Sequence, residues 1–319
     1  MPLNAPRATS GPVALVLGVT HVNYAGYACL QLSNVHGTLI VSLHGGHVLS
    51  WTPAGQRDIF WLSPQAKPAP TAIRGGVPVC WPWFSKQCMP DGAMPHGPVR
   101  NATWKWLACE TQANGNLLLS LEPNRAATGG EAVDTHAKHL EVRLEIELGT
   151  TLRMCLQTHN HGSEPFALTQ ALHSYFAVGD VEQAQLEGVE GLQFDSRVNG
   201  TQGNRQLGAF QLHNVCDNTY AQAMPQTEYH YRLIDPIWQR QISLTTRGSQ
   251  SVVVWNPGAQ GAAAIADVPD AAWRDFLCVE AANAGPDVVV LAPGAHHHLQ
   301  QTLHCQAWPA PHTDKISLI

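Results

Sequence analysis

A strict two-residue alternation between positions 139 and 148 constrains the fold more than any other feature of this sequence. Apolar and charged residues take turns there: Leu140, Val142, Leu144, Ile146 and Leu148 alternate with Glu141, Arg143, Glu145 and Glu147. A β-strand places successive side chains on opposite faces, so this segment predicts a strand with one apolar and one charged face. Gly149 interrupts the alternation, and Leu152, Met154 and Leu156 resume it, which indicates a hairpin.

Short strand-like runs recur along the rest of the chain, between glycine, proline and asparagine turns. Further strands are predicted at residues 37–43, 228–234, 241–245, 251–255, 287–291 and 298–305, and Asn114-Gly115 marks a tight hairpin turn. Helical periodicity is confined to short segments near residues 262–266 and 270–276. The pattern therefore predicts an all-β fold, a large antiparallel β-sandwich or barrel with few short helices. We expect one domain over residues 1–319, with a loose N-terminal arm at about residues 1–16.

The charge balance and the cysteines narrow the class of protein. The 319 residues carry 18 basic and 24 acidic side chains, a formal net charge of −6, which argues against a nucleic-acid-binding surface. Apolar runs fall short of the roughly 20 residues that span a bilayer, and the first residues do not resemble a signal peptide. Eight cysteines are widely spaced without a Cys-x-x-Cys pair, which indicates reduced thiols. We expect a cytoplasmic monomer without nucleic-acid or membrane partners.

Residues 74–100 combine arginines, a histidine and aromatic rings. They read RGGVPVCWPWFSKQCMPDGAMPHGPVR and include Arg74, Trp81, Trp83, Phe84, His96 and Arg100. Guanidinium groups bind carboxylate or phosphate through two parallel hydrogen bonds, and flat aromatic rings suit the C–H groups of a sugar. We therefore expect this segment to line a pocket for an anionic, polyhydroxylated ligand. The competing interpretations are a surface ion pair for Arg74, a solvated position for Arg100 and a turn cap for His96.

Two further residues are candidates for acid–base chemistry. Glu280 ends the apolar run Phe276-Leu277-Cys278-Val279, where desolvation would raise its pKa toward that of a general base. The alternative, a solvated strand end, has equal weight. His173 in Leu172-His173-Ser174-Tyr175-Phe176 is either a core histidine or the acid that complements such a base.

Metal and cofactor motifs are absent from the sequence. His296, His297 and His298 are consecutive, and neighbours on a strand point to opposite faces, so they cannot all bind one ion. They are expected to begin a strand on the solvent side. The chain has neither the GxxxxGK[ST] nor the GxGxxG pattern, and we predict no cofactor and no metal.

Several of these segments occur together, in the same order, in one known family. RGGVPVCWPWF, His96-Gly97 with Arg100-Asn101, LHSYFAVGD, VVVWNPG and FLCVE resemble the D-hexose-6-phosphate mutarotases, also called glucose-6-phosphate 1-epimerases. The resemblance runs from about Gly45 to beyond Glu280. It implies the galactose-mutarotase-like β-sandwich, an isomerase that interconverts the α and β anomers of a hexose 6-phosphate, and no cofactor.

The resemblance also implies residue roles. His173 matches the family's general acid and Glu280 its general base. Arg74 and Arg100 match arginines that engage the phosphate or nearby hydroxyls, His96 a histidine near the ring oxygen, and Asp217 in CDNTY an aspartate that holds a hydroxyl. Two departures affect the expected sugar preference: Asn218 stands where the family usually has a basic residue, and Pro98 interrupts its His-Gly-Phe-Ala-Arg pattern.

In the implied mechanism, Glu280 takes the proton of the C1 hydroxyl while protonated His173 donates to the ring oxygen. The C1–O5 bond opens, the C1–C2 bond rotates, and the ring closes on its other face. Three alternatives remain open: an aldose 1-epimerase for unphosphorylated sugars, a noncatalytic sugar-phosphate-binding protein, and a retaining glycosidase. The glycosidase would need two carboxylates about 5–5.5 Å apart, for which only Glu280 and Asp217 are candidates.

Overall fold

Antiparallel strands dominate the structure, a computed structural model that describes residues 18–124 and 136–308. The expected N-terminal arm at about residues 1–16 lies outside the described residues. The strands are β1 (Val19–Tyr24), β2 (Tyr27–Asn34), β3 (Gly37–Ser42), β4 (His47–Pro53), β5 (Val79–Cys80), β6 (Trp104–Thr111), β7 (Leu117–Pro123), β8 (Leu140–Leu148), β9 (Leu152–Asn160), β10 (Phe166–Leu168), β11 (Gln170–Leu172), β12 (Tyr175–Ala177), β13 (Gln185–Glu187), β14 (Gln193–Ser196), β15 (Thr201–Arg205), β16 (Cys216–Ala221), β17 (Tyr229–Asp235), β18 (Arg240–Arg247), β19 (Ser251–Asn256), β20 (Phe276–Asn283), β21 (Val289–Leu291) and β22 (His296–Ala307). The helices are η1 (Val99–Asn101), α2 (Gly258–Ala264) and η2 (Ala272–Asp275).

Two eight-stranded sheets form the body of the molecule. The first has the order β13-β17-β18-β22-β9-β8-β7-β6. The second has the order β15-β14-β16-β19-β20-β11-β5, with β12 also paired to β20. A four-stranded sheet, β1-β2-β3-β4, and the pair β10-β21 complete the architecture.

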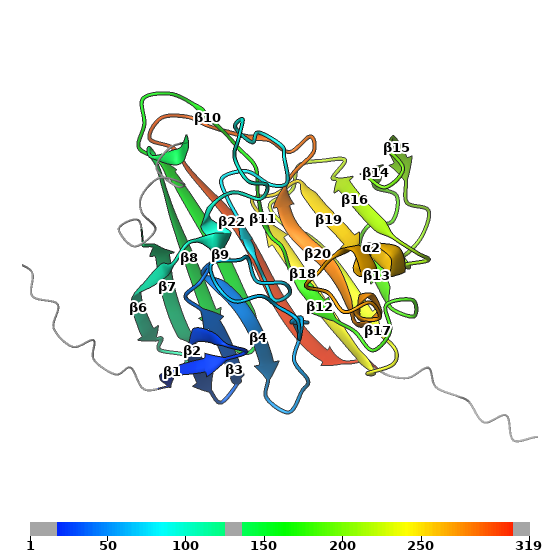
Figure 1. Cartoon of the computed structure of the whole chain (residues 1–319), viewed down its shortest axis with the longest axis horizontal. Helices are drawn as coiled ribbons and strands as arrows, with labels where there is room; N and C mark the ends of the chain where they lie inside the picture. Colours follow the sequence, from blue (N-terminus) through cyan, green and yellow to red (C-terminus); the bar gives the residue numbers. More distant parts are fainter. Residues whose placement is uncertain (1–17, 125–135, 309–319) are drawn as a thin grey trace, which may run out of the picture.

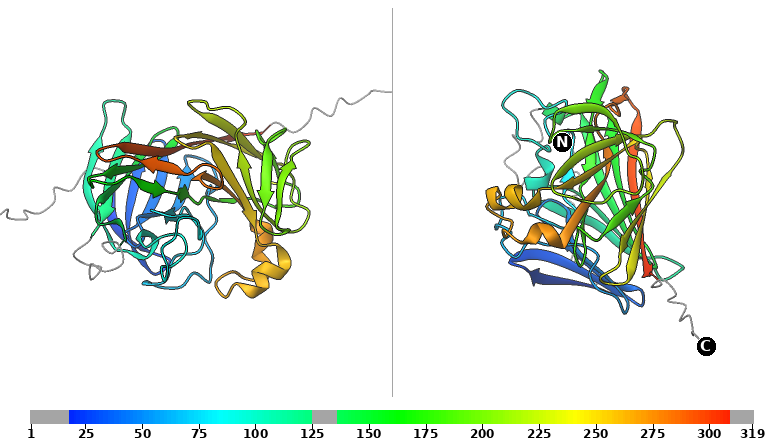
Figure 2. Two further views of the ribbon diagram at one scale, coloured as in Figure 1. Left: turned by 90° about the horizontal axis from the view of Figure 1, so that it is seen from above. Right: turned by 90° about the vertical axis from the view of Figure 1, so that its right-hand side faces the viewer.

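The sheets pack as layers of a sandwich. The first eight-stranded sheet runs behind both the four-stranded sheet and the second eight-stranded sheet, as the face-on and edge-on views show (Figures 1 and 2). A single apolar cluster joins the layers and includes Leu39 of β3, Leu144 of β8 and Val254 of β19. Each such side chain contributes about 1.5–3 kcal/mol on full burial, so this shared core holds the layers together.

The structure confirms the all-β sandwich and the strand predicted from the alternation at residues 139–148. In β8 the apolar residues are buried, and the charged residues between them are exposed or half-buried. The pattern repeats in β9, its hairpin partner. The hairpin between β6 and β7 is confirmed, but its turn is not the type I′ turn that the Asn114-Gly115 pair predicts, because Gly115 has a positive φ of +80° and Asn114 does not.

Elsewhere the boundaries differ from the sequence pattern. The helix expected near residues 262–266 begins earlier, at Gly258, because Asn256 caps its first turn by accepting from the backbone N–H of Gly258. Strand β22 extends past the expected residues 298–305 in both directions. In the part of the chain that the structure describes, no helix has the length and apolar character to cross a membrane. The eight cysteines are free thiols, and Cys88 is exposed while the others are buried.

Candidate active site

Strand pairing brings His173 and Glu280 together. Leu172 of β11 lies opposite Ala281 of β20, and Tyr175 of β12 lies opposite Cys278. Residues 173 and 174 lie between these two pairs and are not part of the ladder. His173 therefore lies beside Glu280. The His173 Nδ1 and Glu280 Oε1 atoms are 3.4 Å apart. The register of strand pairing thus makes neighbours of two residues that are more than 100 positions apart in sequence.

Glu280 is in the interior of a fully buried strand. All eight residues of β20 are buried, and Glu280 is 1% exposed, so the interpretation as a solvated strand end is wrong. Its Oε2 atom has no hydrogen-bond partner among the described residues. Burial raises the pKa of the Glu280 carboxyl well above its ordinary value, and the negative charge of Asp217 raises it further. A carboxyl group kept in such surroundings is characteristic of a functional site.

Aromatic side chains hold the His173 ring in place. The ring stacks on Tyr175 at a centroid distance of 4.9 Å and an interplanar angle of 9°, and Trp255 meets it edge-on. The backbone N–H of His173 donates to Pro78 O. Burial lowers the pKa of His173 well below its ordinary value, and the charges of His96, Arg100 and Arg74 add to this effect. Burial thus disfavours the charged forms of both His173 and Glu280.

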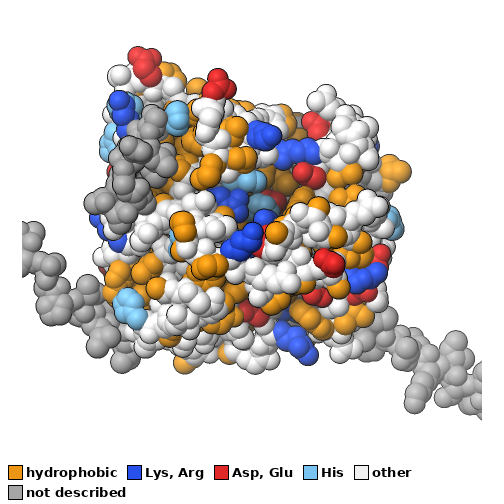
Figure 3. Space-filling model, viewed as in Figure 1, with side chains coloured by type: hydrophobic (Ala, Val, Ile, Leu, Met, Phe, Trp, Pro, Cys, Tyr) orange, Lys and Arg blue, Asp and Glu red, His pale blue; other side chains and the backbone are white. Residues whose placement is uncertain are grey.

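A cavity of about 170 Å³ opens beside this pair. Its lining residues come from β12, β16, β19, β20 and four connecting segments, and they are Arg74, Phe84, Ser85, His96, His173, Tyr175, Arg197, Asp217, Val253, Trp255 and Glu280. Strand pairing brings four of these residues together, because Val253 pairs with Glu280 and Trp255 pairs with Asp217 across neighbouring strands. Figure 3 shows a hollow on one face of the molecule with basic, acidic and histidine side chains at its edge.

Arg74 and His96 of the 74–100 segment line the cavity, as predicted. Arg74 donates from Nε to Asp267 and from Nη1 to the Tyr175 hydroxyl, both at 3.1 Å. It therefore does form an ion pair, but a partly buried one at the edge of the cavity. His96 faces His173 at a centroid distance of 5.9 Å. Burial and the nearby arginines lower the pKa of His96 to about 3, so its imidazole is neutral.

Asp217 and Arg100 occupy different positions relative to the cavity. Asp217 lines it from β16, half-buried, and burial raises the pKa of its carboxyl. Arg100 is not among the lining residues; it lies in η1, and its buried Nε has no hydrogen-bond partner among the described residues. Its charge still lowers the pKa values of His96 and His173, so it acts on the site electrostatically.

The expected role of two tryptophans is wrong. Trp81 and Trp83 are 0% and 2% exposed and belong to the core. Their indole N–H groups donate to Thr158 Oγ1 and to Met94 O, respectively. Buried indoles need such partners, and these partners hold the rings away from the cavity. Phe84 alone of this cluster reaches the cavity, where Tyr175 and Trp255 supply the other aromatic rings.

Sequence reasoning missed Arg197. This residue follows β14 and carries no recognisable motif, so only the pairing of β14 with β16 places it beside Asp217. The backbone N–H of Arg197 donates to Asp217 O, and its Nη1 lies 3.8 Å from Asp217 Oδ1. Its guanidinium carbon is 5.9 Å from the centre of the Phe84 ring. With a side chain 40% exposed, it is a cation at the mouth of the cavity.

One group of residues at the cavity, two of which line it, has the spacing of metal ligands. Ligand atoms of His173, Cys278 and Glu280 lie within 4.8 Å of one another. Burial raises the pKa of the Cys278 thiol well above its ordinary value, so the thiolate that would bind a metal is disfavoured. The arrangement is better suited to proton transfer, since an imidazole and a carboxyl group lie 3.4 Å apart next to a polar cavity.

Known proteins with the same fold give the family of the chain. A family model described as aldose 1-epimerase matches residues 28–304. A Salmonella typhimurium protein named "Putative glucose-6-phosphate 1-epimerase" is 33% identical over 247 residues, covering 76% of this chain and 79% of that protein. A Cenchrus ciliaris protein of the same name is 29% identical over 267 residues, covering 80% and 77%.

The solved structures agree with these sequence relatives. The crystal structure of a protein described as a "putative mutarotase" from Salmonella typhimurium superposes with a TM-score of 0.81 at 27% identity, over 92% of this chain and 95% of that chain. The resemblance noted in the sequence is confirmed, together with the mutarotase-like sandwich that it implied. The chain belongs to the aldose 1-epimerase family.

Proposed function

We propose that this epimerase interconverts the α and β anomers of a hexose 6-phosphate, with glucose 6-phosphate as the first candidate. The observation that carries the proposal is the His173–Glu280 pair, 3.4 Å apart in a cavity edged by arginines. Curated relatives named for glucose-6-phosphate 1-epimerase activity support the same substrate.

The chemistry follows from the cyclic hemiacetal. Its ring oxygen and its C1 hydroxyl are bonded to the same carbon, so ring opening needs an acid and a base side by side. We assign His173 as the acid and Glu280 as the base, which requires the proton of the pair to be on the imidazole when substrate is bound. A buried carboxylate–imidazole pair titrates as a unit, and a shift of its proton between partners leaves the net charge unchanged. The noncatalytic alternative required these two residues to be far apart, and their contact argues against it.

The phosphate group is assigned to Arg197 together with Arg74. Arg197 is the more exposed of the two and has one long ion pair, so its guanidinium hydrogen atoms can turn to a ligand. Arg74 is already held by Asp267 and Tyr175, which presents its remaining nitrogen in a fixed position. Guanidinium groups are the side chains best suited to phosphate oxygens. His96 and Asp217 then face the sugar hydroxyls.

Magnetisation-transfer NMR of anomer exchange tests the proposal directly, with glucose 6-phosphate and glucose measured in the same phosphate-free buffer. We expect faster exchange for the phosphate ester alone. Acceleration of both sugars would assign a general aldose 1-epimerase, and acceleration of neither would contradict the catalytic role.

We further propose a cytoplasmic monomer that works without nucleic-acid or membrane partners. The eight free thiols favour a reducing compartment. Light scattering coupled to gel filtration tests the monomer, since a dimer mass at micromolar concentration would exclude it.

A further inference from the structure

A second cluster of titratable side chains lies away from the cavity, on the solvent face of the first eight-stranded sheet. It consists of Glu141 on β8, His159 on β9 and His161 just after β9, and one ligand atom of each lies within 4.8 Å of the others. The ladder creates this cluster, because Glu141 pairs with His159 across the two strands. Glu141 and His161 are about half exposed, so the cluster is open to solvent.

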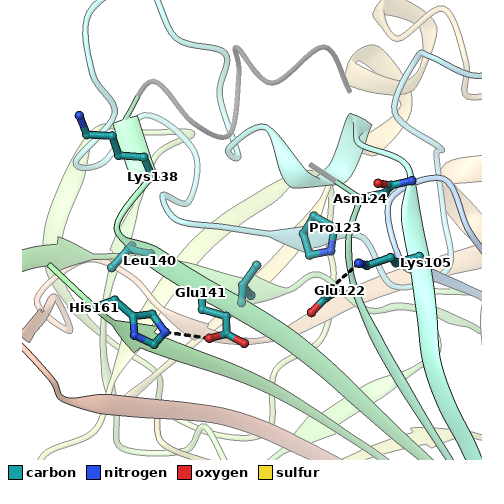
Figure 4. A pocket seen from close by; sticks show the side chains of 9 residues that line it. Lys105, Glu122, Pro123, Asn124, Lys138, Leu140, Glu141 and His161 are labelled. Carbon is teal, nitrogen blue, oxygen red and sulfur yellow. Dashed lines mark hydrogen bonds and ion pairs between the residues drawn. The ribbon is translucent and has the colours of Figure 1, made fainter. Parts of the chain in front are cut away.

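The contacts within the cluster are close. His161 Nε2 and Glu141 Oε2 are 2.7 Å apart, as the dashed line in Figure 4 marks. The rings of His159 and His161 have centroids 3.7 Å apart. On the other side of His159, the ring of His296 from β22 stacks at 3.8 Å and 12°.

The donor set and the geometry of the cluster suit a metal ion. One carboxylate and two imidazoles come together from β8, from β9 and from the residues just after β9, with one ligand atom of each within 4.8 Å of the others. The backbone of Gly294 also hydrogen-bonds the His159 ring, the kind of support that orients a ligating histidine.

We propose that Glu141, His159 and His161 form a binding site for one divalent transition-metal ion such as Zn²⁺. Imidazole nitrogen and carboxylate oxygen are ordinary zinc ligands, and three protein ligands leave one position open for water. The ion takes the place of the hydrogen bond between His161 Nε2 and Glu141 Oε2.

His296 and Arg143 have supporting positions. The His296 ring is parallel to that of His159, so their nitrogens lie side by side rather than converging on one point; His296 is a positioning residue. Arg143 Nη2 lies 3.7 Å from Glu141 Oε1 and leaves Oε2 to the metal. A pocket of about 480 Å³, lined in part by Glu141, His161 and the Lys105–Glu122 ion pair, gives an ion access from solvent (Figure 4).

Calorimetric titration of the full, tag-free chain with ZnCl₂ tests the site. We expect one Zn²⁺ per chain. His159→Gln and His161→Gln should each weaken binding more than about tenfold, because losing even an outer partner of a ligand costs 10–100-fold. His230→Gln is the matched control: His230 and Glu228 form a similar exposed pair, 3.3 Å apart, but without a third ligand. Its affinity should equal that of the wild type.

Co²⁺ absorption distinguishes this cluster from the cavity. The His173, Cys278 and Glu280 group would bind through sulfur and give an intense thiolate charge-transfer band, whereas the proposed site contains nitrogen and oxygen ligands only. We expect d–d bands without charge transfer, and unchanged anomer exchange in His159→Gln and His161→Gln. The proposal is wrong if Zn²⁺ does not bind, if both variants bind it like the wild type, or if the thiolate band dominates.

Discussion

Glu280 introduces an ionisable group into a strand whose residues are all buried. Its pKa in the folded chain lies well above its ordinary value, mainly because of burial. As the pH rises through about 4.5, the unfolded chain releases this proton and the folded chain retains it, so the free energy of unfolding falls. The residue that we assign to catalysis is therefore a source of instability at neutral pH, a common exchange between activity and stability.

Glu280→Gln separates these two effects. Anomer exchange should fall at least about 100-fold, since a positioned base contributes 10²–10⁴-fold. The Tm of the variant relative to the wild type should rise as the pH is raised from about 4 to about 8, because glutamine has no proton to retain. Glu110→Gln, at an exposed position of β6, is the control for the loss of one carboxylate. Wild-type-like exchange in Glu280→Gln would remove the catalytic assignment.

Arg197→Gln tests the phosphate contact. We expect the KM for glucose 6-phosphate to rise about 10- to 100-fold, because a hydrogen bond to a charged group contributes about 1.5–3 kcal/mol, while kcat changes less. Competition by inorganic phosphate should weaken in parallel. Arg232→Gln, an exposed arginine paired with Glu187, provides the reference for a simple change of net charge. Equal KM values for the two variants would contradict the assignment.

At the scale of secondary-structure elements, a strand is easier to predict from the sequence when only one of its faces is buried. Strands such as β8 have one solvated face, so their period of two is visible in the sequence. Strand β20 is buried on both faces, and the alanines after Glu280 gave no sign that the strand continues. The fold class, His173 and Glu280 were therefore accessible from sequence and resemblance, whereas Arg197 depended on the pairing of β14 with β16. Three-residue strands such as β13 are too short to show a period.

The turn that holds His96 provides a test at this scale. Gly97 has φ of +72°, and a Cβ placed there would lie 1.9 Å from Trp81 O. Gly115 has a similar φ of +80° with open space around it. Gly115→Ala should cost about 1–2 kcal/mol of backbone strain. Gly97→Ala should destabilise the chain more in urea unfolding and raise KM, because the turn must move away from Trp81 and shift His96. Equal destabilisation of the two variants would show that backbone strain, and not the close contact with Trp81, determines the loss of stability.

At the scale of the whole molecule, the layers share one apolar cluster that extends from β1 to β22. We propose that the chain is one domain and unfolds as one unit. Scanning calorimetry should give a single transition whose calorimetric and van't Hoff enthalpies agree. Two separable transitions would indicate that the four-stranded sheet or one large sheet folds independently.

The distribution of the cysteines has a practical consequence. Seven thiols are buried, and the exposed one, Cys88, stands three residues after Ser85 of the cavity wall. Its neighbour Gln87 is tied to Gly285 by two hydrogen bonds, which limits the motion of this segment. A maleimide dye should therefore label the native chain at a single position beside the substrate. The unmodified sequence thus already contains an attachment point for a fluorescent reporter of ligand binding.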